Sequence, residues 1–255
     1  MPVPHALRRL APLFALLFLC ALPLRAADNA ALLKDCDAAC AKFDLNRSQS
    51  LAAQALAAKP GDFESMWRLV RAQVDLGEDS QDKGQDAQAE SWFNKALASS
   101  KDLVAKHPQQ STAHYYRALA LGRRALFAGS KEAVQLSQEV EREALQALTL
   151  DPKNGRAHGL IGRYYREMAH LSWVKRKLAE TLFGKLPEGG DAKALQHLKQ
   201  ATQLEPNWVF AWYELGETHE VMGQTAEARK AFQKAASLPK ADHRDDRLKA
   251  DAARQ

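Results

Sequence analysis

The chain has 255 residues, of which 46% are hydrophobic and 26% are charged. This composition is sufficient for a packed core and too poor in glycine and proline for a disordered or fibrous chain. The formal net charge of +5 falls to +2 when residues 1–26 are set aside, because they carry three arginines and no acid (5 − 3 = 2). Such a mild charge argues against nucleic acid as a partner, since phosphate binding needs a concentrated basic face.

The first 26 residues have the pattern of a secretory signal peptide. Arg8 and Arg9 precede an apolar run of 15 residues, Leu10 to Leu24, which is shorter than the roughly 20 residues of a membrane-spanning helix. Because small residues follow, we expect cleavage after Ala26. The rest of the chain is then exported, to the periplasm of a bacterial cell, and contacts a membrane only if the N-terminus is kept as an anchor.

Export leaves two cysteines, Cys36 and Cys40, four residues apart on an expected helix. At this spacing the Cβ atoms lie about 5–6 Å apart, whereas a disulfide needs roughly 3.8 Å. We therefore favour two unpaired cysteines that pack in the helix. An oxidising compartment would still permit a bridge if the helix were distorted. No histidine lies at zinc spacing beside them, and no metal site is expected.

The hydrophobic pattern predicts helices along the whole chain and no strand. In chain order we expect helices over 30–43, 48–58, 63–76, 86–106, 111–127, 131–149, 155–176, 177–183, 192–204, 209–222 and 225–237. Residues 241–255 are polar and charged, and we expect them to form a short solvated helix or a frayed end that caps the array.

A proline follows each of five helices in this series. Ala-rich helices are each closed by one of Pro60, Pro108, Pro152, Pro206 and Pro239, because proline ends a helix. The intervals are 48, 44, 54 and 33 residues, and the last is close to the 34-residue tetratricopeptide repeat. We expect the surplus of the longer units between their two helices, in the polar stretches 78–88 and 128–131 and in a 20-residue insertion within about 168–190.

The last two units match the tetratricopeptide repeat position by position. Small residues at positions 8, 20 and 27 let two antiparallel helices approach, and large residues at 4, 7, 11 and 24 fill the spaces between hairpins. These residues are Trp212, Leu215, Gly216, His219, Ala228, Phe232 and Ala235 in the final unit, and His158, Ile161, Gly162, Tyr165, Ala194, Leu198 and Ala201 in the unit before. The chain is therefore predicted to be an all-α superhelical solenoid of four to five helix hairpins over residues 27–240.

The insertion resembles the regulator of microtubule dynamics family. Its elements are Gly162-Arg163-Tyr164, Leu171-Ser172-Trp173, the basic run 175–177, Ala179 to Phe183-Gly184, and Pro187, while residues 67–72 are similar to an earlier Trp-Arg-Leu-Ala-Arg-Ala element. The resemblance covers roughly residues 60–240 and implies a repeat fold. The animal members are implicated in microtubule association, and one of them in tethering organelle membranes. We expect Trp173 and Phe183 in the core.

The concave surface of such an array is lined by the first helix of each hairpin. Groove-facing repeat positions place Trp67, Arg71, Tyr115, Arg156, Arg163, Arg166, Tyr213 and Glu217 there. Arginine and aromatic side chains suit an extended peptide with an acidic group or a free carboxylate. Because the repeat register is less secure in the earlier units, a core position for Trp67 and Tyr115 is the alternative.

No motif indicates catalysis, a metal or a cofactor. Patterns for metal-ligand pairs, activated nucleophiles and nucleotide loops do not occur, and acidic residues lie beside basic ones as on solvated helical faces. We therefore expect a non-enzymatic scaffold or adaptor of the cell envelope that binds a protein or peptide in its concave groove. The alternative is a microtubule-associated regulator or an organelle-tethering protein. The sequence leaves the partner and the oligomeric state open.

Overall fold

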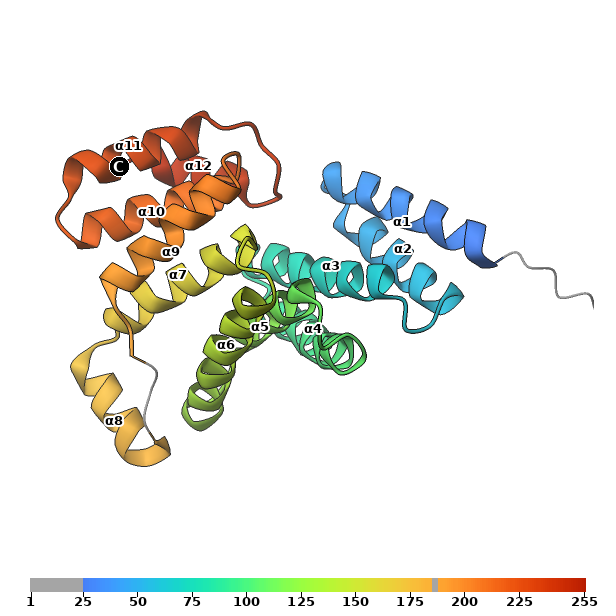
Figure 1. The fold of residues 1–255 in the computed structure, drawn as a ribbon, viewed down its shortest axis with the longest axis horizontal. Helices are drawn as coiled ribbons and strands as arrows, with labels where there is room; N and C mark the ends of the chain where they lie inside the picture. Colours follow the sequence, from blue (N-terminus) through green and yellow to red (C-terminus); the bar gives the residue numbers. More distant parts are fainter. Residues whose placement is uncertain (1–24, 185–187) are drawn as a thin grey trace, which may run out of the picture.

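The structure is a computed structural model that describes residues 25–184 and 188–255 (Figure 1). These residues form helices and no strand, which confirms the predicted all-α fold. The helices are α1 (Arg25–Ala41), α2 (Leu45–Ala58), α3 (Phe63–Asp82), α4 (Asp86–Lys106), α5 (Ser111–Ala125), α6 (Ser130–Leu150), α7 (Gly155–Ala169), α8 (Trp173–Phe183), α9 (Asp191–Leu204), α10 (Val209–Val221), α11 (Thr225–Ser237) and α12 (Asp245–Ala252).

The predicted signal peptide lies almost wholly outside the described residues, since residues 1–24 are not among them. Within the described ranges, no helix has the length and apolar character needed to cross a membrane.

Consecutive helices pair as hairpins that stack along the chain (Figure 1). The pairs are α1 with α2, α3 with α4, α5 with α6, α7 with α9, and α10 with α11. The first helices α3, α5, α7 and α10 also contact one another in sequence and form one wall of the array. α12 packs on α10 and α11. Stacked hairpins in which each contacts its neighbours are the arrangement of a helical solenoid.

Close packing within the hairpins depends on a glycine that faces a large residue. A Cβ added to Gly216 would lie 2.6 Å from Cδ1 of Phe232, and one added to Gly162 would lie 2.7 Å from Cγ of Leu198. Real Cβ atoms do not approach so closely, so only glycine allows the helices this separation. The structure buries the other large and small residues assigned to these units, namely Ile161, Tyr165, Ala194, Ala201, Leu215, His219, Ala228 and Ala235.

The second hairpin differs from the prediction in where its surplus lies. We expected a polar connection over 78–88, but only residues 83–85 separate α3 from α4. The surplus is in helix length, since α3 and α4 have 20 and 21 residues and α10 and α11 have 13 each. A Cβ at Gly77 would lie 2.3 Å from Cε1 of Phe93, and this pair has the spacing of its counterpart in the last unit (93 − 77 = 232 − 216). Position 8 is therefore Gly77, about two turns beyond the predicted place.

A side-chain N–H at repeat position 4 satisfies the carbonyl of the proline that closes the preceding unit. The pairs are His114 Nε2 with Pro108 (2.9 Å), His158 Nε2 with Pro152 (3.1 Å) and Trp212 Nε1 with Pro206 (2.9 Å). A carbonyl in such a turn has no partner within the helix, so the side chain supplies one. His158 and Trp212, which were assigned to packing, are half-buried and serve the turn as well.

The insertion leaves the stack as a short separate helix, at the lower left of Figure 1. We expected one helix over 155–176, but α7 ends at Ala169, and residues 170–172 separate it from α8. The returning chain passes against the end of α7, where the amide of Gly190 donates to the carbonyl of Tyr165 at 3.1 Å. α8 packs on α6. The prediction that Trp173 and Phe183 are buried concerns side chains outside the described set.

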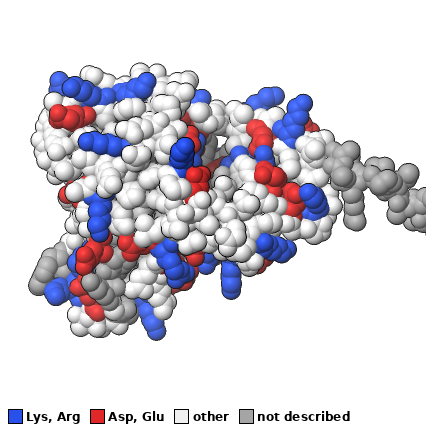
Figure 2. Space-filling model, in the orientation of Figure 1, with Lys and Arg blue, Asp and Glu red and all other residues white. Residues whose placement is uncertain are grey.

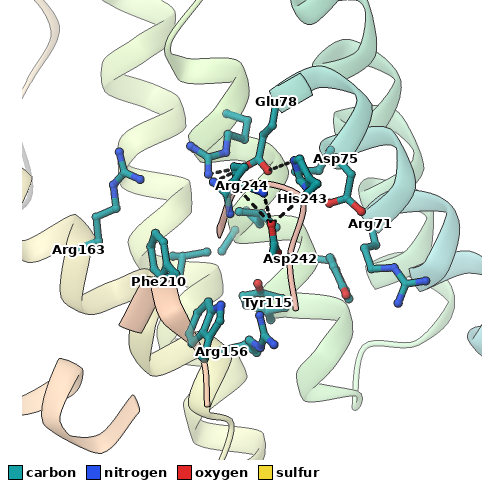
Figure 3. A pocket seen from close by; sticks show the side chains of 18 of the residues that line it. Arg71, Asp75, Glu78, Tyr115, Arg156, Arg163, Phe210, Asp242, His243 and Arg244 are labelled. Atoms are coloured by element: carbon teal, nitrogen blue, oxygen red, sulfur yellow. Dashed lines mark hydrogen bonds and ion pairs between the residues drawn. The ribbon is translucent and has the colours of Figure 1, made fainter. Parts of the chain in front are cut away.

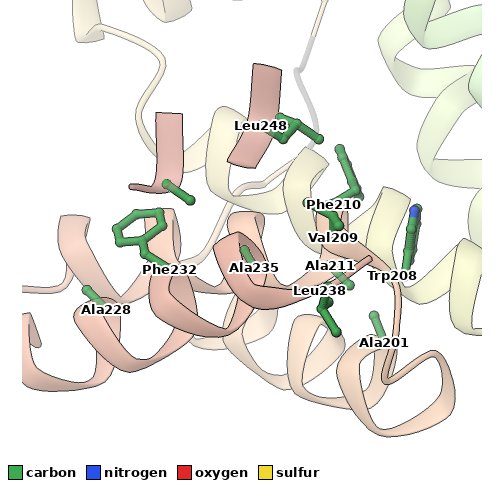
Figure 4. Close-up of a cluster of buried hydrophobic side chains, with 11 residues drawn as sticks. Ala201, Trp208, Val209, Phe210, Ala211, Ala228, Phe232, Ala235, Leu238 and Leu248 are labelled. Atoms are coloured by element: carbon green, nitrogen blue, oxygen red, sulfur yellow. The ribbon is translucent and has the colours of Figure 1, made fainter. Parts of the chain in front are cut away.

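The C-terminal end of the array is closed by α12. Figure 4 shows the buried cluster beneath it, formed by Ala201, Trp208, Val209, Phe210, Ala211, Ala228, Phe232, Ala235, Leu238, Leu248 and Ala252. α12 contributes the last two of these residues, so the C-terminal region carries an apolar face that covers the last hairpin and is more than a polar tail. Residues 239–244, which connect α11 to α12, are thereby brought beside the concave wall.

The two cysteines are unbridged. Cys36 is fully buried between α1 and α2, with its Sγ 3.3 Å from the carbonyl oxygen of Ser48. Burial raises the pKa of the Cys40 thiol to about 11. A thiol with so high a pKa is a poor nucleophile at neutral pH, which applies to Cys40, whereas Cys36 packs in the interior.

Candidate functional site

The concave wall contains a cavity of about 370 Å³ that is rich in arginine and aromatic side chains (Figure 3). These lining residues include Trp67, Arg71, Tyr115, Tyr116, Arg123, Arg156, Arg163, Tyr164, Trp208, Phe210 and Arg244. α3 also supplies Asp75 and Glu78, and the spacing of these acids from Arg71 (i, i+4, i+7) puts all three on one face of the helix. Helices α3, α5 and α7 therefore build the site together.

The cavity brings together five of the eight predicted groove residues, namely Trp67, Arg71, Tyr115, Arg156 and Arg163. Trp67 is half-buried at the wall, where it stacks on Tyr116 with ring centroids 5.6 Å apart. The repeat register predicted for this hairpin was wrong by seven residues, yet Arg71 still faces the cavity. A shift of seven residues is about two full turns, which returns a side chain to the same face.

The other three predicted groove residues, Arg166, Tyr213 and Glu217, are not among the lining residues. Arg166 donates to Glu214 at 2.5 Å and to Glu217 at 3.2 Å, which ties α7 to α10. The ring of Tyr213 packs on Phe232, with centroids 5.7 Å apart. In the structure these residues hold neighbouring helices together, and they are not available to a ligand in the cavity.

Most of the cavity arginines already have acidic partners. Arg71 donates to Asp37 of α1 at 3.1 Å, and Arg163 donates to Glu167 of its own helix at 2.6 Å. Arg156 differs, because no ion pair joins it to an acid in the part of the chain that the structure describes. Its guanidinium instead lies 4.2 Å from the centre of an indole ring at the start of α10. Four arginines were expected to bind an acidic peptide, namely Arg71, Arg156, Arg163 and Arg166. Among them, Arg156 alone has no acidic partner within the described residues.

The indole ring beneath Arg156 belongs to Trp208, which is buried. It lies directly on α7 because Gly159 has no side chain, and a Cβ there would be 2.4 Å from Cζ3 of the ring. The sequence places Gly159 at a groove-facing position, where it provides space for Trp208. The stacked pair is therefore fixed in place by the packing of α10 on α7.

Glu78 of α3 is at the centre of an ion-pair network inside the cavity (Figure 3). It is 3% exposed and pairs with Arg123 of α5, with Nη1 of Arg244 at 2.9 Å, and with Nε2 of His243 at 3.4 Å. Burial would raise its pKa, but the guanidinium groups of Arg123 and Arg244 hold that pKa at about 2. Glu78 is thus an ionised carboxylate whose charge is balanced by α5 and by the C-terminal segment.

The repeat register explains why Glu78 was not predicted. With Gly77 at position 8, Glu78 takes position 9, the groove-facing place that the sequence analysis gave to Arg71. The available signal was the pair Leu76-Gly77, which repeats Ile161-Gly162 and Leu215-Gly216 of the later units.

Residues 239–244 form a non-helical segment that lies across the concave wall. In Figure 1 the connection before α12 reaches towards the α1–α2 hairpin, and Nζ of Lys240 lies 4.3 Å from the ring centre of Phe43 in the turn of that hairpin. A carboxylate oxygen of Asp245 accepts the amides of Ala241 and Asp242, at 2.8 and 2.9 Å, and so fixes the bend. The chain's own C-terminal segment therefore occupies part of the candidate groove.

Asp75, Glu78 and His243 offer three ligand atoms within 4.8 Å of one another, a grouping that could hold a metal ion. Burial raises the pKa of Asp75 to about 7. Burial alone would lower the pKa of His243, but Asp242 and Glu78 raise it to about 10. Both imidazole nitrogens already face acids, Nε2 the carboxylate of Glu78 and Nδ1 that of Asp242, and Glu78 is shared with Arg123 and Arg244. This group of described residues is better explained as an ion-pair network.

Charges of both signs lie on the face of the molecule shown in Figure 2. On this face lysine and arginine are interspersed with aspartate and glutamate, and a row of basic side chains runs along its upper left edge. That nucleic acid is not a partner stays a prediction from the composition.

Stacked hairpins with glycines at their crossing points define the chain as a tetratricopeptide-type helical solenoid. A thermophilic TPR protein of Thermus thermophilus has a similar structure, with a TM-score of 0.64 at 22% sequence identity, covering 89% of this chain and 100% of that one. At this identity the likeness supports the fold alone.

The family model described as "Regulator of microtubule dynamics protein 1-3" matches residues 32–255, so the chain belongs to the regulator of microtubule dynamics family. This confirms the resemblance drawn from the insertion. Regulator of microtubule dynamics protein 3 of Rattus norvegicus is 26% identical over 187 residues, which is 73% of this chain and 39% of that protein. Protein 1 of Mus musculus is 26% identical over 147 residues, 58% of this chain and 48% of that protein. The chain thus spans less than half the length of these relatives.

Proposed function

We propose that the chain is an exported, non-enzymatic scaffold whose concave groove binds a segment of another polypeptide. The observation that carries this proposal is that the groove already holds a stretch of non-helical polypeptide, its own residues 239–244. Lys240 of this segment lies over the ring of Phe43 in the first hairpin, and His243 and Arg244 pair with Glu78 of the second. A surface that accommodates one such segment has the shape and chemistry to accommodate another.

The chemistry of the cavity supports a polypeptide ligand. Trp67, Tyr115 and Phe210 offer aromatic contact area at low cost in side-chain entropy. Arg156 offers a guanidinium without an acidic partner among the described residues, which suits an acidic side chain or a terminal carboxylate. Among the other charged groups of the cavity, Arg71, Glu78 and Arg163 each have an ion-pair partner.

Site-specific photo-crosslinking in cells tests the groove. A photo-reactive amino acid replaces Leu119, which lines the cavity from α5, in the full chain. The matched control replaces Lys230, which is exposed on the second helix of the last hairpin. We expect one or a few discrete protein adducts from position 119 and none from position 230. Position 119 giving no adducts, or the same adducts as position 230, would refute groove binding.

Export is proposed from the composition of residues 1–26. The test is N-terminal sequencing and fractionation of the full chain after expression in its own cells. We expect a mature protein that begins at Ala27 and is released with the periplasmic or extracellular fraction. Recovery of an uncleaved chain in the cytoplasm would contradict the proposal.

The alternative function follows from the family. The relatives are named as regulators of microtubule dynamics, and a role on microtubules is the second candidate for this chain. Co-sedimentation with polymerised tubulin separates the two functions. Saturable co-sedimentation that Arg156→Glu abolishes would favour the alternative, and no co-sedimentation would favour the exported scaffold.

A further inference from the structure

We propose that residues 239–244 are a built-in competitor for the groove, and that the partner that displaces them carries two adjacent basic side chains. This inference rests on the proposed function, since it names the partner chemistry and the regulation of the same groove.

The basic side chains of the segment meet an acidic face of α3. Asp75 and Glu78 are three residues apart on one face, and His243 and Arg244 both contact Glu78. Asp242 of the segment pairs with the same two cations, at 3.1 Å from Nδ1 of His243 and 3.7 Å from Nε of Arg244, and leaves with them. If these two cations leave, Glu78 keeps only Arg123. Arg71 lies on the same face of α3 but is paired with Asp37 of α1. Asp75, Glu78 and Arg123 then carry a net charge of −1 when both acids are ionised (−2 + 1 = −1).

A buried acid without sufficient cations is costly, and this cost selects the incoming ligand. A partner with two neighbouring basic residues restores the two contacts that Glu78 loses with the segment. A partner with an acidic residue at this place would add a like charge next to Asp75 and Glu78. This half of the groove therefore differs from the sequence expectation of an acidic peptide, which only the Arg156 end can satisfy.

The segment can leave the groove as a loop while its two ends stay packed. Leu238 before it and Leu248 after it are buried in the cluster beneath α12. The segment itself belongs to none of the hairpins, whose helices pack within the pairs α1–α2 to α10–α11. Because it is tethered, its effective concentration at the groove is on the order of millimolar. A free peptide then binds with an apparent Kd equal to its intrinsic Kd divided by the fraction of molecules whose groove is free.

A fluorescent peptide with the sequence of residues 238–247 tests the competitor, using the full chain and fluorescence anisotropy. The receiving variant carries His243→Ala and Arg244→Ala, which removes the competing cations and leaves Glu78 paired with Arg123. The matched control is Arg254→Ala, a basic residue of the same C-terminal region whose ion pair is with Asp251. We expect the double variant to bind the peptide at least about tenfold more tightly than the wild type or the control. The same peptide with alanine at the positions of His243 and Arg244 should lose this binding.

Equal affinity of the double variant and the wild type, or no binding by a double variant that keeps its helical content and melting temperature, would overturn the proposal. Hydrogen exchange on the wild type gives a second test that needs no folded variant. Excess unlabelled peptide should speed exchange at the amides of Ala241 and Asp242, which Asp245 protects. Unchanged protection at saturating peptide overturns the proposal as well.

The outcomes separate this proposal from the proposed function. Photo-crosslinks at position 119 that persist while the peptide fails to bind refute the competitor and support groove binding by some other chemistry. Peptide binding without any crosslinked protein in cells refutes the proposed cellular partner and supports the chemistry of the competitor.

Discussion

Replacing one glycine tests the close packing of the second hairpin. In Gly77→Ala the new Cβ would lie 2.3 Å from Cε1 of Phe93, whereas ordinary contact begins at 3.4 Å. The ring would have to move by 1.1 Å (3.4 − 2.3), and it has no exposed surface on which to move. Overpacking of this kind costs about 1–3 kcal/mol, and this site belongs at the upper end. Because alanine favours the helix more than glycine does, the substitution also stabilises the folded state by about 1 kcal/mol. The expected net loss is about 2 kcal/mol.

Gly122→Ala is the matched control. Gly122 lies in α5, and the nearest atom to an added Cβ is 3.8 Å away, on Val140. The same chemical change should therefore raise stability by up to about 1 kcal/mol. Thermal unfolding followed by circular dichroism measures both variants. For a chain of this size, about 1 kcal/mol corresponds to roughly 2–4 °C, so the two melting temperatures should move in opposite directions.

The pair Gly77→Ala with Phe93→Leu extends the test. A smaller side chain at position 93 makes room for the new methyl group, so the double variant should lose less than the sum of the two single losses. If Gly77→Ala melts at or above the wild-type temperature, or if Gly122→Ala falls by as much, the assignment of position 8 to Gly77 is wrong.

Three further predictions concern the stability of variants at titratable side chains. Arg166→Ala leaves the carboxylate of Glu214, which is 3% exposed, without its 2.5 Å partner, and should lower the free energy of unfolding in urea by about 2–3 kcal/mol. The exposed Arg229→Ala should change it by less than about 0.5 kcal/mol, and equal losses would contradict this account. Burial raises the pKa of Asp75 to about 7, so its contribution to stability is present while it is protonated and is lost as the pH rises from 3.8 towards 7. Asp75→Asn should therefore stabilise the protein above neutral pH and have little effect in acid, and a pH-independent difference would argue against this. Burial and a neighbouring histidine lower the pKa of His197 to about 4, so the stability that its neutral ring contributes above pH 6.5 declines as the pH falls towards 4. Because the ring is partly exposed, His197→Gln should remove no more than about 1 kcal/mol of this dependence, and an acid-side profile identical to that of the wild type would contradict it.

Local patterns predicted most of the helix boundaries. Pro152, Pro206 and Pro239 end their helices for steric reasons that need no tertiary information. Gly223, with φ of 71°, marks the turn between α10 and α11 in the same way. Where the pattern was polar but the chain stayed helical, prediction failed. Residues 78–88 look like a loop because they are charged and contain glycine, yet α3 continues to Asp82.

The site was harder to predict because its chemistry is made by distant residues. The helical period placed Trp67, Arg71 and Arg156 on the groove side, and the structure brings them to one cavity. No local pattern, however, indicates which arginines are already paired. Glu78 was overlooked for a related reason, because its partner Arg244 lies 166 residues further along the chain (244 − 78).

Those distant contacts bear on how the protein unfolds. In an open solenoid each unit touches only its neighbours, so the end units can melt first and alone. Here Arg247 pairs with Asp82 and Arg244 with Glu78, which fastens the last unit to the second one. An end unit that frays must break these contacts too, so the loss is shared between distant parts of the array. We therefore expect a single cooperative transition where a linear array of the same length would show a series of partial ones.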